Sequence, residues 1–214
     1  MTSERTRIKI CGLRDPDHVR VAADAGADAI GVVFYKPSPR YVTPDEAASV
    51  AAAVPPYVTA VGLFVNEPAD SVKAILARVP LGLLQFQGEE APEYCASFGV
   101  PFVRAVAMEP GTDLVELAHR FSRARALLLD AHVPGVPGGT GSTFDWSRIP
   151  PNLPIPVILS GGLTAENVGQ AVREVRPWAV DVSSGVERGR GVKDPGKIVE
   201  FIRSVRREDA RQPA

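Results

Sequence analysis

The strongest constraint in this sequence is a repeated alternation of short aliphatic runs with Ala-rich amphipathic stretches. Glycine or proline clusters separate the runs, and the chain carries 19 Gly and 20 Pro. Parallel strands need long crossover connections, which helices usually supply, so this alternation predicts parallel strands joined by helices. The eight predicted strands are residues 8–11, 29–34, 59–64, 83–86, 102–106, 126–129, 156–159 and 179–182. The predicted helices are residues 16–25, 44–54, 68–79, 91–98, 113–121, 164–175 and 194–205.

The number of units decides between two architectures. An open doubly wound sheet needs only five or six strands, whereas eight units of about 27 residues fit a closed barrel. We therefore predict a single-domain (β/α)8 TIM barrel over residues 1–206, with a long Gly/Pro-rich loop after the sixth strand. Residues 207–214 are charged and aperiodic, and we predict that they form a frayed tail. The proline-rich segment 150–156 is short and indicates an extended connector instead of a domain boundary.

Composition excludes several classes of protein. The formal net charge is -1, which argues against nucleic-acid and membrane-surface binding because both need a basic surface. Two cysteines cannot build a disulfide scaffold and indicate a reducing compartment. The first nine residues are polar, and no apolar stretch reaches the roughly 18 residues of a membrane span. We therefore expect a cytoplasmic protein.

Two candidate proton-transfer residues stand at the carboxyl ends of strands, where barrels of this kind place their active sites. Cys11 ends the first strand and shares a face with Lys9, whose ammonium group would favour the thiolate. Asp130 ends the sixth strand beside the apolar Leu128, where desolvation would raise its pKa and suit it to proton donation. Equally, Cys11 could be a small buried hydrophobe and Asp130 a turn residue.

Glycine-containing turns follow the seventh and eighth strands. They read Ser160-Gly161-Gly162 and Ser183-Ser184-Gly185, and Thr164 opens the next predicted helix. Glycines let backbone N–H groups approach an anion, and phosphate sites recur at these two strand ends. Two such turns on consecutive strands predict phosphate binding.

Arg40 and Asp181 are further candidates. Arg40 closes a loop stiffened by two prolines and could hold a carboxylate through two hydrogen bonds, although most loop arginines are simply solvated. Asp181 lies in the eighth strand, next to the first strand in a closed barrel, and we hypothesise that it pairs with Lys9. The three histidines show no ligand spacing, and we predict no metal site.

Nearly the whole chain resembles the phosphoribosylanthranilate isomerases, which act on the route from chorismate to tryptophan. The resemblance rests on an ordered set of motifs, of which any one alone would be unspecific. These are KICG (9–12), SPR (38–40), LLLDA (127–131), FDW (144–146), LSGGL (159–163) and VDVSSGVE (180–187).

The resemblance implies an aldose-ketose isomerase that needs no cofactor. It would convert N-(5-phosphoribosyl)anthranilate into 1-(2-carboxyphenylamino)-1-deoxyribulose 5-phosphate by an Amadori rearrangement. Asp130 corresponds to the family acid, which protonates the furanose ring oxygen and opens the sugar to a Schiff base. Cys11 corresponds to the family base, which removes the C2′ proton and leaves an enol amine that tautomerises to the ketone.

The resemblance also implies a substrate-binding set. Arg40 would hold the anthranilate carboxylate, and the backbone amides of Gly161, Gly162, Ser184 and Gly185 would hold the phosphate. Apart from the resemblance, Lys9 and Gln85 are substrate-binding candidates because they lie on the inward faces of their strands. We expect a small phosphosugar substrate, no nucleic-acid or membrane partner, and a monomer or a homodimer.

One departure from the family pattern is visible on the fourth strand. The family commonly reads LQLHG there, whereas this chain reads LQFQG, so Gln87 replaces a histidine. Gln85 and Gln87 share the inward face, and an amide can hydrogen-bond but cannot become cationic. Neither proposed proton-transfer residue is affected.

Other phosphosugar barrels remain alternatives. Ribulose-phosphate epimerases and thiamin-phosphate synthases share the late glycine turns. Epimerases would need metal-binding His and Asp residues at strand ends, which this sequence lacks. Isomerases that also act on the histidine-pathway analogue usually carry paired aspartates. A non-catalytic phosphosugar-binding barrel is disfavoured because both proton-transfer residues are present. The glycines of residues 131–143 would permit a lid over the substrate.

Overall fold

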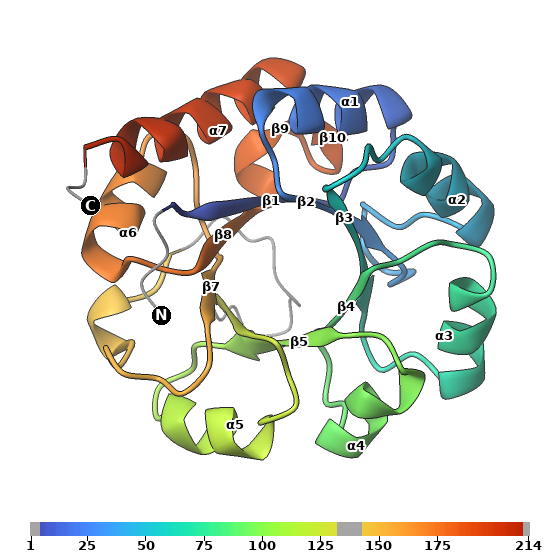
Figure 1. Ribbon diagram of the computed structural model, residues 1–214, viewed down its shortest axis with the longest axis horizontal. Coiled ribbons are helices and arrows are strands. Elements are labelled where there is room, and N and C mark those ends of the chain that lie inside the picture. Colours follow the sequence, from blue (N-terminus) through green and yellow to red (C-terminus); the bar gives the residue numbers. More distant parts are fainter. Residues whose placement is uncertain (1–4, 132–142, 212–214) are drawn as a thin grey trace.

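Eight parallel strands close into a barrel in the computed structural model, which describes residues 5–131 and 143–211 (Figure 1). Each strand pairs with the next in sequence, and β8 (Ala179–Val182) returns to pair with β1 (Arg7–Cys11). This closure confirms the predicted barrel over the open sheet. The remaining barrel strands are β2 (Ala29–Val33), β3 (Thr59–Phe64), β4 (Leu83–Phe86), β5 (Phe102–Ala107), β6 (Leu127–Asp130) and β7 (Val157–Leu159).

Helices surround the barrel, and most of them follow the predicted ranges closely (Figure 1). They are α1 (Pro16–Ala25), α2 (Pro44–Ala52), α3 (Ala69–Leu76), α4 (Pro92–Cys95), α5 (Leu114–Arg120), α6 (Val168–Val175) and α7 (Pro195–Asp209). Short 3-10 turns occupy Ala96–Phe98, Trp146–Arg148 and Ser184–Val186. The predicted long loop after β6 falls largely on residues 132–142, outside the described residues. No helix among the described residues is long and apolar enough to cross a membrane.

The helix ends explain part of the glycine and proline punctuation. Asp15 caps α1 through the backbone N–H of Asp17, Pro16 occupies the first turn, and Gly26 ends the helix at a φ of 104°. A capping box of Thr43 and Glu46 starts α2 in the same way. Local sequence therefore sets where several connections begin and end.

The barrel interior is filled below its mouth. An apolar cluster inside the strands closes the floor, so the barrel is a packed core and not a pore. A larger cluster joins the outer faces of the strands to the helices. The floor consists of Val103, Ala105, Ala126, Leu128, Ile158 and Ala179.

A small antiparallel hairpin separates β8 from α7. It pairs β9 (Glu187–Gly189) with β10 (Val192–Lys193), and the sequence prediction contains no element there. The segment is short, charged and lacks an alternating pattern, so periodicity gives no signal for it.

The last helix extends beyond the predicted boundary at residue 206. Helix α7 continues to Asp209, Glu208 is buried, and residues 212–214 lie outside the described part of the chain. The Asp209 carboxylate accepts hydrogen bonds from the Thr6 backbone N–H at 3.1 Å and the Thr6 hydroxyl at 2.7 Å. These contacts hold residues 207–209 in the helix, so the predicted frayed tail begins too early.

Substituting Asp209 tests this correction. We expect Asp209→Ala to lower the free energy of unfolding by roughly 1 to 3 kcal/mol, because the charged acceptor of two Thr6 donors is lost. Arg207→Ala, an exposed change in the same turn, should cost less than about 0.5 kcal/mol. Urea denaturation measures both, and equal effects would contradict the assignment.

Candidate active site

A cavity of about 280 Å³ opens at the carboxyl ends of the strands. Its lining joins polar groups to an apolar wall that includes Val33, Leu63 and Val65, a mixture typical of small-molecule sites. Seven of the nine predicted site residues line it, whereas Lys9 and Gly185 do not. The seven are Cys11, Arg40, Gln85, Asp130, Gly161, Gly162 and Ser184.

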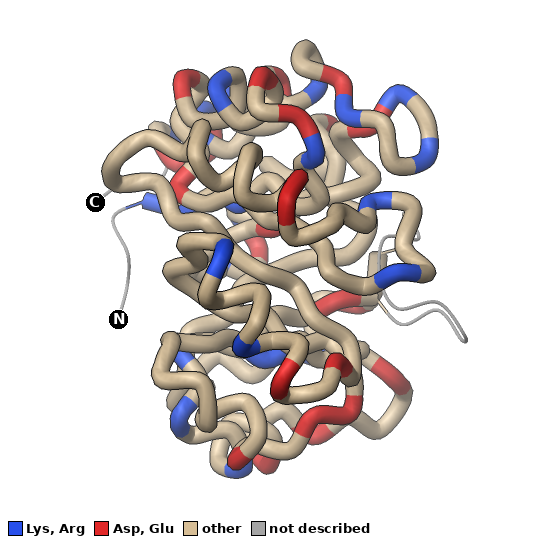
Figure 2. The backbone as a smooth tube through the Cα atoms, turned by 90° about the vertical axis from the view of Figure 1, so that its right-hand side faces the viewer, with Lys and Arg blue, Asp and Glu red and all other residues tan. Residues whose placement is uncertain are grey.

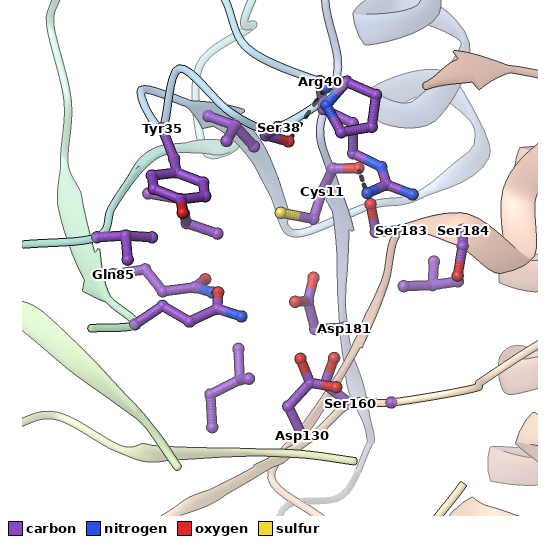
Figure 3. A pocket seen from close by; sticks show the side chains of 18 of the residues that line it. Cys11, Tyr35, Ser38, Arg40, Gln85, Asp130, Ser160, Asp181, Ser183 and Ser184 are labelled. Carbon is purple, nitrogen blue, oxygen red and sulfur yellow. Dashed lines mark hydrogen bonds between the residues drawn. The ribbon is translucent and has the colours of Figure 1, made fainter. Parts of the chain in front are cut away.

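Cys11 faces this cavity from the end of β1 (Figure 3). Its register partner on β2 is Gly31, and a Cβ at Gly31 would stand 2.9 Å from the Cys11 Sγ. A glycine there leaves room for the thiol. Burial raises the pKa of Cys11, and the positive charge of Lys9 opposes this effect.

Lys9 and Asp181 form a buried ion pair beneath the mouth. The two residues are register partners on β1 and β8, and the Lys9 Nζ lies 2.9 Å from the Asp181 Oδ1, as hypothesised from the sequence. Burial alone would lower the pKa of Lys9, but the Asp181 carboxylate and Cys11 together outweigh this effect and raise that pKa. Asp181 lines the cavity and Lys9 lies behind it, so Lys9 is placed to support the site instead of lining it.

Asp130 lies at the end of β6, and Asp181 lies between it and Cys11 in Figure 3. Burial, reinforced by the negative charge of Asp181, raises the pKa of Asp130 to about 6. A carboxyl group with this pKa can donate a proton near neutral pH, as the sequence analysis predicts.

The two glycine turns pack tightly at the ends of β7 and β8. Gly161 and Gly162 have φ values of 82° and 63°, and a Cβ at Gly161 would stand 2.9 Å from the Asp130 Oδ1. A Cβ at Gly185 would stand 1.9 Å from the carbonyl oxygen of Leu163. Within residues 5–131 and 143–211, the backbone N–H groups of Gly161, Gly162, Ser184 and Gly185 have no hydrogen-bond acceptor. They remain available to an anion.

Arg40 lines the cavity, but its guanidinium already has a partner. The Glu187 carboxylate accepts hydrogen bonds from the Arg40 Nε at 2.7 Å and Nη2 at 3.0 Å. Glu187 is the last residue of the VDVSSGVE motif, and the sequence pattern predicts no role for it. Its contact with Arg40 spans 147 residues, a separation for which a single sequence carries no signal.

Gln85 and Gln87 both line the cavity from the β4 side. The Gln85 Nε2 donates to the Gln87 Oε1 at 3.2 Å, which confirms that the two side chains share a face. The buried Gln85 Oε1 has no hydrogen-bond partner among the described residues. An unsatisfied buried acceptor is costly and marks a place where a ligand donor would be favourable.

Two further polar residues, Tyr35 and Arg190, line the cavity and were missed by sequence reasoning. Tyr35 comes from the loop after β2 and Arg190 from the β9–β10 hairpin, whereas Ser183, which also lines the cavity, belongs to the predicted turn after β8. The described residues contain no cluster of three or more His, Cys, Asp or Glu side chains suited to a metal ion. Lys and Arg are interspersed with Asp and Glu along the chain in Figure 2, unlike the one-sided basic surface of nucleic-acid-binding proteins.

Known proteins share both the sequence and the fold. The family model for N-(5'phosphoribosyl)anthranilate (PRA) isomerase matches residues 8–204. The N-(5'-phosphoribosyl)anthranilate isomerase of Dechloromonas aromatica is 56% identical, with 96% of this chain and 98% of the relative covered.

Two solved structures extend the likeness. One is a phosphoribosyl anthranilate isomerase in complex with reduced 1-(o-carboxyphenylamino)-1-deoxyribulose 5-phosphate, with 37% identity, a TM-score of 0.81, and 94% and 98% of the two chains covered. The other describes monomers of the dimeric isomerase from Thermotoga maritima, with 35% identity, a TM-score of 0.82 and the same coverage.

Replacing the carboxylates of Asp130 and Asp181 by amides should change the free energy of unfolding in opposite directions. A carboxylate whose pKa is raised in the folded state destabilises the protein above that pKa, and the penalty disappears as the pH falls toward about 4. Asp130→Asn should therefore stabilise the protein at pH 8 by on the order of 2 to 3 kcal/mol, with the gain shrinking between pH 6 and 4.

Asp181→Asn is the matched control, because it leaves the Lys9 ammonium group buried without its partner. It should destabilise the protein by roughly 3 to 5 kcal/mol at pH 8. Urea denaturation across this pH range measures both variants. A destabilising Asp130→Asn at pH 8 would contradict the electrostatics described above.

Proposed function

The chain belongs to the N-(5'-phosphoribosyl)anthranilate isomerase family and is an isomerase of tryptophan biosynthesis, and we propose that Cys11 and Asp130 carry its two proton transfers. One observation supports this assignment most. A thiol and a carboxyl group with a pKa of about 6 face one cavity. Its edge also carries backbone N–H groups that have no acceptor among the described residues. An acid, a base and an anion site are the parts that isomerisation of a phosphosugar requires.

The substrate is proposed to be held at both of its charged ends. The glycine turns after β7 and β8 offer backbone N–H donors for the phosphate, and Arg40 offers its remaining donors for the anthranilate carboxylate. The ribose then lies across the cavity between Cys11 and Asp130. The Gln85 Oε1, which has no hydrogen-bond partner in the described part of the chain, could accept from a donor on the substrate.

Ring opening is assigned to Asp130. The protonated carboxyl group gives its proton to the furanose ring oxygen while the anilino nitrogen lone pair forms a C=N bond to C1′. The C1′–oxygen bond breaks, which leaves a cationic Schiff base and a carboxylate at Asp130. The negative charge of Asp181 favours the protonated starting state, because it raises the Asp130 pKa.

The second proton transfer is assigned to Cys11. Its thiolate removes the C2′ proton, and the electron pair of that bond forms the C1′–C2′ double bond while the iminium nitrogen is neutralised. The resulting enol amine tautomerises to the ketone. Lys9 supports this step electrostatically, because its positive charge lowers the Cys11 pKa against the effect of burial.

Removing either group should abolish most of the activity. We expect Cys11→Ala and Asp130→Asn each to lower kcat by about 10²- to 10⁴-fold, the usual loss for a general acid or base. Cys95→Ala is the control, because Cys95 is also buried but lies in α4 away from the cavity. Loss of fluorescence from synthesised phosphoribosylanthranilate reports turnover, and near wild-type rates in both variants would refute the assignment.

We also propose that one chain supplies a complete active site, whether the protein is a monomer or a homodimer. We propose the cytoplasm as its location. Residues of β1, β4 and β6 and of the turns after β7 and β8 converge on one cavity. The Thermotoga maritima relative is described as dimeric, and its structure as that of monomers. Light scattering gives the oligomeric state, and turnover should persist when dilution favours monomers.

A further inference from the structure

Glu187 holds the guanidinium of Arg40 along one edge. Its two carboxylate oxygens accept from the Arg40 Nε and Nη2, and within residues 5–131 and 143–211 the Nη1 donors and one Nη2 donor have no acceptor. Glu187 is 8% exposed, and the side chain of Arg40 is 11% exposed although it lines the cavity. Burial alone would raise the pKa of Glu187, but the Arg40 hydrogen bond and the Lys193 charge lower it to about 2. The carboxylate is therefore ionised at neutral pH.

Lys193 compensates the charge of this carboxylate. Its buried ammonium group donates to the Glu187 Oε1 at 2.9 Å, the Ser183 carbonyl at 2.7 Å and the Ser183 Oγ at 3.2 Å. These contacts use all three ammonium donors. Two cations and one anion give the Arg40–Glu187–Lys193 cluster a net positive charge. Glu187 can therefore orient Arg40 without cancelling the attraction of the cluster for an anion.

The hairpin that carries Glu187 and Lys193 also packs against the Arg40 loop. A Cβ at Gly191 would stand 2.6 Å from the Pro39 carbonyl oxygen, and a Cβ at Gly12 would stand 2.6 Å from the Arg40 Cδ. The Gly191 N–H donates to the Glu187 Oε2 at 3.0 Å. Both glycines have positive φ values, so any side chain there would be strained. These contacts leave Arg40 little freedom to turn.

We propose that Glu187, supported by Lys193, is a positioning residue that aims the free edge of Arg40 at the carboxylate of the substrate. The proposal rests on the carboxylate-binding role assigned to Arg40 under the proposed function. Holding the guanidinium before substrate arrives reduces the rotamer entropy lost on binding, and it selects substrates with a planar anion at this end of the cavity.

A pair of ligands tests the proposal without relying on turnover. One is reduced 1-(o-carboxyphenylamino)-1-deoxyribulose 5-phosphate, and the other is the same compound without its carboxyl group. We expect Glu187→Gln to weaken binding of the first about tenfold and of the second less than about twofold, measured by titration calorimetry. In steady-state kinetics KM should rise by a similar factor while kcat changes little.

Three variants make the result decisive. Arg40→Ala should remove the tighter binding of the ligand that carries the carboxyl group. Adding Glu187→Gln to Arg40→Ala should then change ligand affinity little, because the effects of coupled residues are not additive. Glu187→Asp keeps the negative charge beside Lys193 but shortens the side chain that reaches Arg40. It should therefore also weaken binding of only the carboxylated ligand, and it keeps the test usable if Glu187→Gln folds poorly. Arg188→Ala, exposed on the same hairpin, should bind both ligands normally.

Different failures have different meanings. The positioning role would be overturned if Glu187→Gln and Glu187→Asp weakened binding of both ligands equally, or of neither. This holds where Arg40→Ala still removes the tighter binding of the carboxylated ligand. If Arg40→Ala leaves the preference intact, the carboxylate-binding role of Arg40 fails and the positioning role fails with it. Wild-type turnover is measured separately and tests the proposed proton transfers.

Discussion

The buried ion pair between Lys9 and Asp181 links the closure of the barrel to its chemistry. The pair joins β1 to β8, the two strands whose contact closes the sheet, and the two buried charges compensate each other. The same two charges act on the site above them. Asp181 raises the pKa of Asp130, and Lys9 acts against the burial that raises the pKa of Cys11. The ion pair thus acts on both proposed proton-transfer groups: Asp181 favours the protonated form of Asp130, and Lys9 partly offsets the burial and the Asp181 charge that raise the pKa of Cys11.

The site also depends on three glycines, because a side chain at any of them would collide with a group of the site. Gly31 leaves space for the Cys11 thiol, Gly161 for the Asp130 carboxylate, and Gly12 for the Arg40 stem. In each case the glycine and the group that it accommodates come from different strands or from the turns that follow them. A Gly→Ala substitution at any of these positions would push the neighbouring Cys11, Asp130 or Arg40 side chain out of place. The spacing of the reactive groups is therefore set by close backbone packing as much as by their own hydrogen bonds.

Local sequence was sufficient for most of the architecture. The strand and helix ranges follow from periodicity, caps and turn residues, and the placement of Cys11 and Asp130 follows from the rule that barrel sites lie at strand ends. What sequence could not predict depends on distant partners. The β9–β10 hairpin is stabilised by the contact of Glu187 with Arg40, and the last turn of α7 by the contact of Asp209 with Thr6. A charged segment resembles a solvated tail unless its partner, far away in the chain, is known.

The central claim is that burial and Asp181 hold Asp130 as a titratable acid near neutral pH. The most direct measurement is the ¹³C NMR titration of the side-chain carboxyl groups in the ligand-free protein, with the Asp130 signal assigned by its absence in Asp130→Asn. The account predicts a pKa of about 6 for this group. A pKa near 4, the ordinary value for an aspartate, would contradict it.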